Sequence, residues 1–276
     1  MWKKAIDKAS YKLKIIRVQR LINIRIAKSY RTVSNEALCI LTGLTPIAIK
    51  IEEAFQSYEY IRGSTKEEAL VDRDMGVKYW HYPAEMITFL TEDNEETSTI
   101  QIFTDGSKSE QGVGAGIAIF KSGNLINSLK YRLNKRCTNN QAEQLAILRA
   151  LEYTENIETE DKTATIYTDS RMTLDSLKNS NIHTFLIEEI RRKVVEMDEI
   201  NWKIRFCWVK AHAGIQENEL ADTLAKEAAT NAVIIECYKN VPKSVVLSEL
   251  GGIGVEKWQR EWDQTTKGAI TKNTSR

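Results

Sequence analysis

Cysteine is scarce in this 276-residue chain, and its four cysteines lie far apart in the sequence. They form no CxxC motif and have no histidine at zinc-site spacing, so neither a disulfide framework nor a zinc site is indicated. Long apolar runs are also missing, because none approaches the ~20 residues that a membrane-spanning helix needs. Charge at Lys3, Lys4 and Asp7 argues against a signal peptide. We therefore expect an intracellular protein of the cytoplasm or nucleus, neither secreted nor bound to a membrane.

A net charge of either sign is missing as well, since 39 lysines and arginines are balanced by 38 aspartates and glutamates. This balance alone argues against a nucleic-acid partner. The average hides an asymmetry, because the segment from Met1 to Arg31 contains ten basic residues and a single acid, Asp7. Such a segment suits a polyanion, although a solvated helix face is the alternative.

The first 62 residues are expected to be helical. Apolar residues recur every three or four positions between Ile15 and Ile26, which predicts an amphipathic helix with a basic opposite side. A short second helix follows, with Ser34 as its cap and Gly43 at its end, and a third helical stretch comes next.

The predicted secondary structure changes near residue 99, where strands begin. Residues 63–98 lack sustained periodicity and are expected to form a connector, whereas 99–231 should form a domain and 232–276 a loosely structured tail. Three strands followed by alternating helices and strands predict an α/β (α+β) fold, with a five-stranded mixed sheet flanked by helices. The expected order is strands at 100–103, 113–120 and 125–133, a helix at 140–155, a strand at 163–168, helices at 170–178 and 184–197, a strand at 204–210 and a helix at 217–230.

Two of these strands end by running into an aspartate, Asp105 in TDGS and Asp169 in YTDS. If the strands are adjacent, two costly buried carboxylates meet, and a bound cation would compensate them. The alternative is that each aspartate only caps the turn or helix that follows. Glu143 and Asp222 lie on helix faces that are able to point at the same strand ends. Four converging carboxylates would suit a hard cation such as Mg²⁺ or Mn²⁺.

The segments TDGS, TNNQAE, YTDS and VKAHAGIQENELADTLAKEAA together resemble the successive motifs of type 1 ribonuclease H. The resemblance implies a ribonuclease H-like fold and a hydrolase that cuts the RNA strand of RNA/DNA hybrids with two Mg²⁺ ions, for which Mn²⁺ substitutes. It implies Asp105, Glu143, Asp169 and Asp222 as the metal-binding catalytic acids and His212 as a mobile catalytic histidine. Substrate contacts are expected from Asn139, Asn140, Asn218 and Arg171, although Arg171 stands where the bacterial enzymes have a neutral amide.

Other features set the limits of the resemblance. The segment 181–202 is too short for the basic protrusion with which the bacterial enzymes grip substrate, so the basic amino-terminal region is expected to supply grip. Glycines 112, 114 and 116 do not make a phosphate loop, because a strand follows them. An inactive nucleic-acid-binding module and another nuclease of the same fold are the alternatives, against which the four acids and TNNQAE argue. We expect no small-molecule cofactor, and the sequence predicts no oligomeric state.

The segment from Gln19 to Ala54 resembles the region just downstream of the reverse-transcriptase core in insect-type non-LTR retrotransposons. A ribonuclease H domain follows that region in such polyproteins, which is the order found here. No paired aspartates of the YxDD kind occur in the chain. We therefore expect the carboxy-terminal part of a retrotransposon polyprotein without its polymerase.

Overall fold

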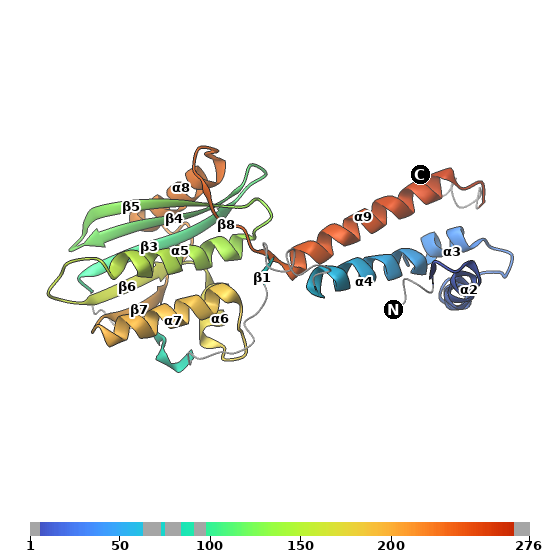
Figure 1. Cartoon of the computed structure of the whole chain (residues 1–276). Coiled ribbons are helices and arrows are strands. Elements are labelled where there is room, and N and C mark those ends of the chain that lie inside the picture. The colour runs from blue at the N-terminus through green and yellow to red at the C-terminus, as the bar shows by residue number, and fades with distance from the viewer. Residues whose placement is uncertain (1–5, 63–72, 75–83, 91–97, 268–276) are drawn as a thin grey trace. The chain divides into compact units, whose positions relative to one another are not determined.

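The computed structural model describes residues 6–62, 73–74, 84–90 and 98–267. The chain divides into two compact units: unit 1 comprises residues 1–71 with 243–276, and unit 2 comprises residues 72–242 (Figure 1). No helix among the described residues is long and apolar enough to cross a membrane.

Unit 2 is built on a seven-stranded mixed sheet. Its strand order is β2-β7-β6-β3-β4-β5-β8, with β3, β4 and β5 antiparallel and the remaining pairs parallel. A separate parallel pair joins β1 to β9. The strands are β1 (Arg73–Asp74), β2 (Thr88–Phe89), β3 (Ile100–Lys108), β4 (Val113–Lys121), β5 (Asn124–Leu133), β6 (Thr163–Thr168), β7 (Lys203–Trp208), β8 (Glu236–Tyr238) and β9 (Val241–Pro242).

Helices cover both faces of this sheet. They are the 3-10 turn η2 (Ala84–Met86) and the α-helices α5 (Asn139–Thr154), α6 (Arg171–Lys178), α7 (Phe185–Glu199) and α8 (Gln216–Thr230). Helices α5, α6 and α7 enclose the main core, to which β4 contributes Ala115 and Ile117. The opposite face packs Phe103 and Ala118 against Ala221 of α8. Alternate residues of β4 therefore serve two different cores, as the two-residue period of a strand requires.

The predicted fold is confirmed, with two corrections at its edges. The five expected strands and four expected helices are all present, and the short strands β2 and β8 extend the sheet at its two ends. Strand β3 continues to Lys108 rather than ending at Phe103, because Asp105, Gly106 and Ser107 stay paired with β4. Much of the expected connector, at 63–72, 75–83 and 91–97, lies outside the described residues.

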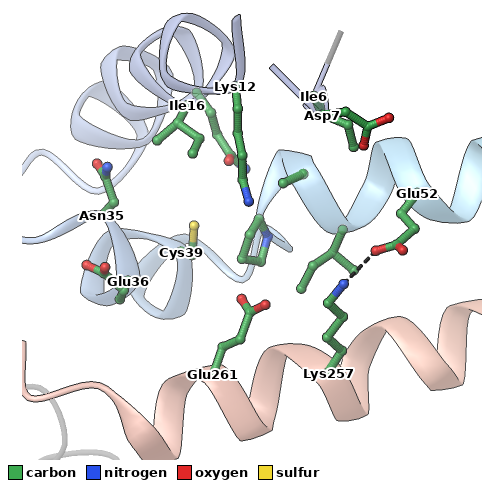
Figure 2. Close-up of a pocket in the computed structure, with 14 residues that line it drawn as sticks. Ile6, Asp7, Lys12, Ile16, Asn35, Glu36, Cys39, Glu52, Lys257 and Glu261 are labelled. Carbon is green, nitrogen blue, oxygen red and sulfur yellow. Dashed lines mark hydrogen bonds and ion pairs between the residues drawn. The ribbon is translucent and has the colours of Figure 1, made fainter. Parts of the chain in front are cut away.

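Unit 1 consists of α2 (Ala9–Ile26), α3 (Asn35–Thr42), α4 (Ile47–Arg62) and α9 (Lys243–Gln264). Helix α3 begins as predicted, with the Ser34 hydroxyl accepting from the Ala37 amide, and ends at Gly43 with φ +67°. Helix α9 packs along α4, and an ion pair joins Lys257 to Glu52 beside a cavity of this unit (Figure 2).

The expectation of a loosely structured tail over 232–276 is wrong for most of its length. Strands β8 and β9 and the 22-residue helix α9 occupy 236–264. Three glycines weakened the helical signal there, and Gly254 is tolerated because its bare backbone lies against the side chain of Glu53 in α4. Helix α9 is stabilised by packing against a segment some 200 residues earlier in the chain, which local periodicity does not reveal.

Candidate active site

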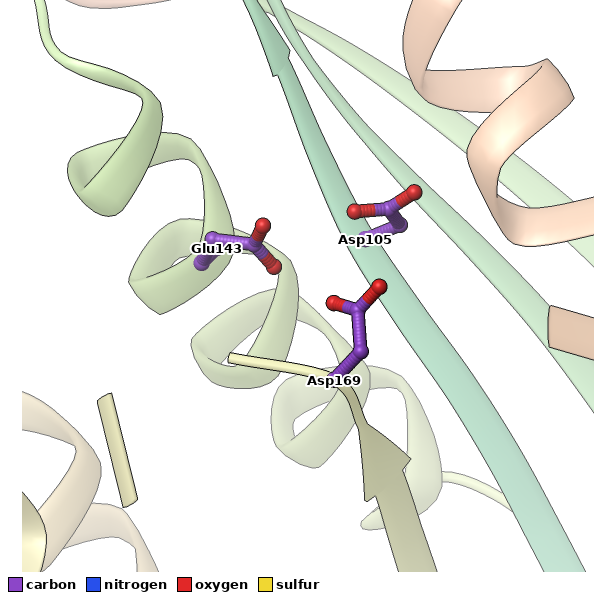
Figure 3. A group of neighbouring side chains, drawn as sticks. All are labelled: Asp105, Glu143 and Asp169. Carbon is purple, nitrogen blue, oxygen red and sulfur yellow. The ribbon is translucent and has the colours of Figure 1, made fainter. Parts of the chain in front are cut away.

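Three of the predicted acids meet beside the centre of the sheet. Asp105 lies within β3, not at its end as predicted, and Asp169 follows the last residue of β6. Because Thr104 pairs with Thr168, the two aspartates occupy neighbouring positions on adjacent parallel strands. Glu143 reaches them from α5, and carboxylate oxygens of the three residues lie within 4.8 Å of one another (Figure 3).

Burial makes this cluster electrostatically costly. Asp105 is 7% exposed and Glu143 is 5% exposed. Burial, followed by the charge of Asp169, raises the pKa of Asp105 to about 7, although the Gly106 amide donates to its carboxylate at 2.7 Å. Burial and the charges of both aspartates raise the pKa of Glu143 well above its ordinary value, and burial raises that of Asp169. The folded protein therefore holds like charges together where a cation would neutralise them.

The donor set fits a hard divalent cation. All three side chains offer carboxylate oxygens, which are the ligands that Mg²⁺ and Mn²⁺ prefer. The Oε2 atom of Glu143 is buried and has no hydrogen-bonding partner among the described residues, whereas Oε1 accepts from Asn139 at 3.3 Å. A buried oxygen of this kind costs free energy unless something binds it.

Two glycines bring the supporting helices close to the sheet. A Cβ added to Gly106 would lie 2.7 Å from the Glu143 amide nitrogen, and one added to Gly116 would lie 2.2 Å from the Ala221 carbonyl oxygen. Gly106 therefore lets α5 approach β3, while Gly116, which pairs with Asp105, lets α8 approach β4. Glycines 112, 114 and 116, which superficially suggest a phosphate loop, are positions where α8 packs closely against the sheet.

Asp222 lies beside the cluster without joining it. It is not part of the group formed by Asp105, Glu143 and Asp169, yet its charge raises the pKa of both aspartates. Its Oδ2 atom pairs with Lys226 Nζ at 2.6 Å, one helical turn along α8. Lys226 was not among the predicted site residues, although the four-residue spacing of acid and base signals such a pair.

His212 lies in the loop between β7 and α8 in a conformation unusual for a residue other than glycine. Its φ is +50°, and its side chain is exposed. It lies near enough to Asp169 for the protonated ring to lower the pKa of that carboxyl. Asn218 is buried near the start of α8, and its Oδ1 atom has no hydrogen-bonding partner among the described residues. The catalytic role of His212 and the substrate contact of Asn218 stay predictions.

The two asparagines that are predicted to contact RNA are the first two residues of α5. The helix cap is Thr138, whose side chain accepts from the Gln141 amide in a capping box, so Asn139 and Asn140 are the first helical residues rather than caps. Asn139 touches Glu143, and the Asn140 Oδ1 atom accepts from Thr173 at 3.2 Å. Asn139 therefore lies beside an acid of the cluster, and Asn140 is tied to α6.

Arg171 is exposed at the start of α6. Its guanidinium lies 3.9 Å from the centre of the Trp208 ring, and Trp208 Nε1 donates to the Asp169 carbonyl at 3.2 Å. The Arg171 amide donates to the same carbonyl. The Arg171 side chain is therefore held against Trp208, while its backbone bonds that of the third acid.

The sequence of this chain is similar to those of known ribonucleases H. The sequence profile of the RNase H family matches residues 97–230. A ribonuclease H of Novosphingobium aromaticivorans is 31% identical over 146 residues, which are 48% of this chain and 98% of that protein. One from Bartonella bacilliformis is 32% identical over 147 residues, covering 49% of this chain and 92% of that protein.

Two further comparisons concern a viral polyprotein and a solved structure. The Pol polyprotein of equine infectious anemia virus (strain Wyoming) is 31% identical over 177 residues, which are 59% of this chain but 14% of that polyprotein. The crystal structure of RNase H1 from the archaeon Halobacterium salinarum NRC-1 is 23% identical, covers 47% of this chain and 96% of that chain, and has a TM-score of 0.36.

The family assignment rests on the bacterial relatives, which this chain matches over nearly their whole length at more than 30% identity. The chain belongs to the ribonuclease H family. Its acidic cluster is that of a type 1 ribonuclease H domain, a hydrolase.

Proposed function

We propose that this chain hydrolyses the RNA strand of RNA/DNA hybrids endonucleolytically and that it requires Mg²⁺, with Mn²⁺ as a substitute. The observation that carries the proposal is the convergence of Asp105, Glu143 and Asp169, with one oxygen of Glu143 buried and unpartnered among the described residues. The names of the bacterial relatives support this reaction class. The nearby charge of Asp222 favours two ions over one, because four carboxylates balance four positive charges.

The four acids and the histidine of the site have different roles, which follow from where they lie. Asp105, Glu143, Asp169 and Asp222 would hold two ions, which when bound supply an activated water and stabilise the leaving 3′ oxygen. Only its Oδ2 atom pairs with Lys226, so its Oδ1 atom remains available for an ion. His212, near Asp169 on an exposed loop, takes up a proton during the reaction and releases it to solvent.

Substrate recognition is assigned to the amino-terminal ends of α5 and α6. Asn139 and Asn140 stand at a helix amino terminus, which favours phosphate, and their amides are able to bond a 2′-hydroxyl. Arg171, stacked on Trp208, offers a cation to the nucleic-acid backbone, and Asn218 holds the loop of His212 against the substrate. The basic helix α2 adds sequence-independent grip.

We also propose that the chain descends from an insect-type non-LTR retrotransposon, with unit 2 as its nuclease and the helices of unit 1 as its accessory part. The resemblance of Gln19–Ala54 and the match to a retroviral Pol polyprotein support this origin. Sequencing the genomic DNA upstream tests it. An in-frame YxDD motif is expected there, and an unrelated upstream gene with its own stop codon would contradict the origin.

The function is tested with purified full-length protein and an end-labelled RNA/DNA hybrid. Cleavage of the RNA strand is expected with Mg²⁺ or Mn²⁺ and none with EDTA, while duplex DNA of the same sequence stays intact. Protein that binds the hybrid but never cuts it would instead support the inactive binding module.

A further inference from the structure

The first turn of α5 is held from two sides. On one side Gly106 of β3 lies directly against the Glu143 amide nitrogen and the Asn139 carbonyl. On the other side is Gln141, which is 3% exposed and lies roughly opposite Asn139 and Glu143 on the helix, because successive residues are about 100° apart. The position of this turn therefore depends on what holds Gln141.

The Gln141 side chain uses its whole hydrogen-bonding capacity. Its Nε2 atom donates to Asp74 Oδ2 at 2.8 Å and to the Asn240 carbonyl at 2.9 Å. Its Oε1 atom accepts from the Thr138 amide at 3.0 Å, which completes the capping box, and from the Thr138 hydroxyl at 3.4 Å. A fully satisfied buried amide tolerates few alternative positions.

Its partners lie in β1 and directly before β9. Asp74 lies in β1 and pairs in register with Pro242 of β9, directly after Asn240 and Val241. Asp74 is partly buried, and burial raises its pKa although the bond from Gln141 opposes that rise. The Asn240 carbonyl also lies 3.8 Å from the Cys137 Sγ atom, just before α5 begins. The two strand segments and the helix opening thus form one hydrogen-bonded junction.

We propose that Asp74 is a positioning residue for hybrid cleavage, acting through Gln141 on the first turn of α5. The proposal rests on the function proposed above, because it assumes that Asn139 and Asn140 contact the hybrid. Without the bond, the helix opening pivots about Gly106. The backbone of Asn139 and of Glu143 lies at this pivot, so Asn140, which is next to Gln141, moves most.

The test compares Asp74→Ala with Asp74→Asn in the full chain. Alanine removes the acceptor for Gln141, whereas asparagine keeps an oxygen there and loses only the charge. Asp161→Ala is the matched control, because Asp161 also accepts side-chain hydrogen bonds in unit 2, from Thr99 and Thr163. The readouts are KM and kcat for hybrid cleavage, and the hybrid dissociation constant in EDTA.

Asp74→Ala should raise KM and the dissociation constant about tenfold and lower kcat less than threefold. Asp74→Asn and Asp161→Ala should stay within twofold of wild type. Gln141→Glu, which keeps a capping-box residue at that position, should behave as Asp74→Ala does, and the double variant should be no worse than either.

The outcomes separate this proposal from the proposed function. A wild-type protein that never cuts hybrid would overturn the proposed function, while the binding measurements still decide the role of Asp74. Unchanged binding in Asp74→Ala and Gln141→Glu, or a loss in Asp74→Asn equal to that in Asp74→Ala, would overturn the positioning role.

Discussion

The backbone of Gly116 lies against the Ala221 carbonyl oxygen, so closely that an added Cβ would come within 2.2 Å of it. Ala221 directly precedes Asp222, and Gly116 pairs with Asp105 across β3 and β4. This contact therefore sets how near α8 brings its acid to the acid of the central strand. It links the packing of α8 against the sheet to the chemistry of the site.

Gly116→Ala should push α8 away from the sheet. Because overpacking costs typically about 1–3 kcal/mol, we expect a loss of that size in the free energy of unfolding and at least a tenfold loss of cleavage. Urea unfolding and hybrid cleavage measure the two effects. Gly251→Ala is the control, since nothing lies within 4 Å of its added Cβ in α9 and alanine favours helix. Equal behaviour of the two variants would contradict the packing account.

Asp105→Asn should abolish cleavage, because an amide lacks the charge that the ions require. It should also stabilise the metal-free protein at pH 8 by about 1–3 kcal/mol, since each unit of raised pKa is worth about 1.4 kcal/mol and the acids share their charges. Thermal unfolding in EDTA measures the stability. Added Mg²⁺ should then stabilise wild type and not the variant, and cutting by the variant at the wild-type rate would refute the site.

The same carboxyl gives the metal-free protein a pH-dependent stability. The pKa of Asp105 rises from its ordinary 3.8 to about 7 on folding, so the folded state holds the proton more tightly than the unfolded state. Its contribution is fully present below about pH 4 and is lost as pH rises through 7. Wild type in EDTA should lose stability over this window more steeply than Asp105→Asn. Parallel stability curves for the two proteins would contradict the raised pKa.

His212→Ala should lower kcat by about 10²-fold or less. General acid–base help contributes up to roughly 10²- to 10⁴-fold, and water partly replaces a side chain on an exposed loop. Single-turnover cleavage at saturating hybrid measures the step. A loss as complete as that of Asp105→Asn would mean that His212 has been assigned the wrong role.

The choice of RNA is tested most cleanly at Asn140. The double alanine variant of Asn139 and Asn140 also removes the bond from Asn139 to Glu143, so it would disturb a metal ligand. Asn140→Ala alone should raise KM for the hybrid several-fold and leave Mg²⁺ binding, followed by calorimetry, unchanged. Thr173→Val removes the bonds of the Thr173 hydroxyl to Asn140 and to the Ser170 hydroxyl but keeps the Asn140 amide, and it serves as the control. If Asn140→Ala cuts hybrids normally, the RNA selection lies elsewhere, with Arg171 the next residue to test.

The basic side of α2 should contribute salt-dependent grip. Replacing exposed Lys14, Arg17 and Arg25 with glutamine should raise KM more than it lowers kcat. The salt dependence of hybrid binding should weaken too, by about 0.9 in the log–log slope for each phosphate that the protein no longer neutralises. Exchanging lysine and arginine at the same three positions keeps the charge and should leave the slope unchanged. Identical slopes for all three proteins would remove α2 from the binding account.

The sequence by itself determined the order of strands and helices from Ile100 to Thr230 and three of the converging acids. It did so because periodicity and turn residues are local properties, and because the four motifs are short and close to the chemistry. The basic character of α2 is likewise a matter of composition.

Tertiary structure decided what depends on contacts between distant segments. Pairing with β4 carried β3 past Asp105, and packing on α4 turned an expected loose tail into helix α9. The junction of Gln141 with Asp74 joins residues 67 positions apart. Local patterns carry little of this information, because the stabilising free energy comes from burial against partners that the chain meets only when folded.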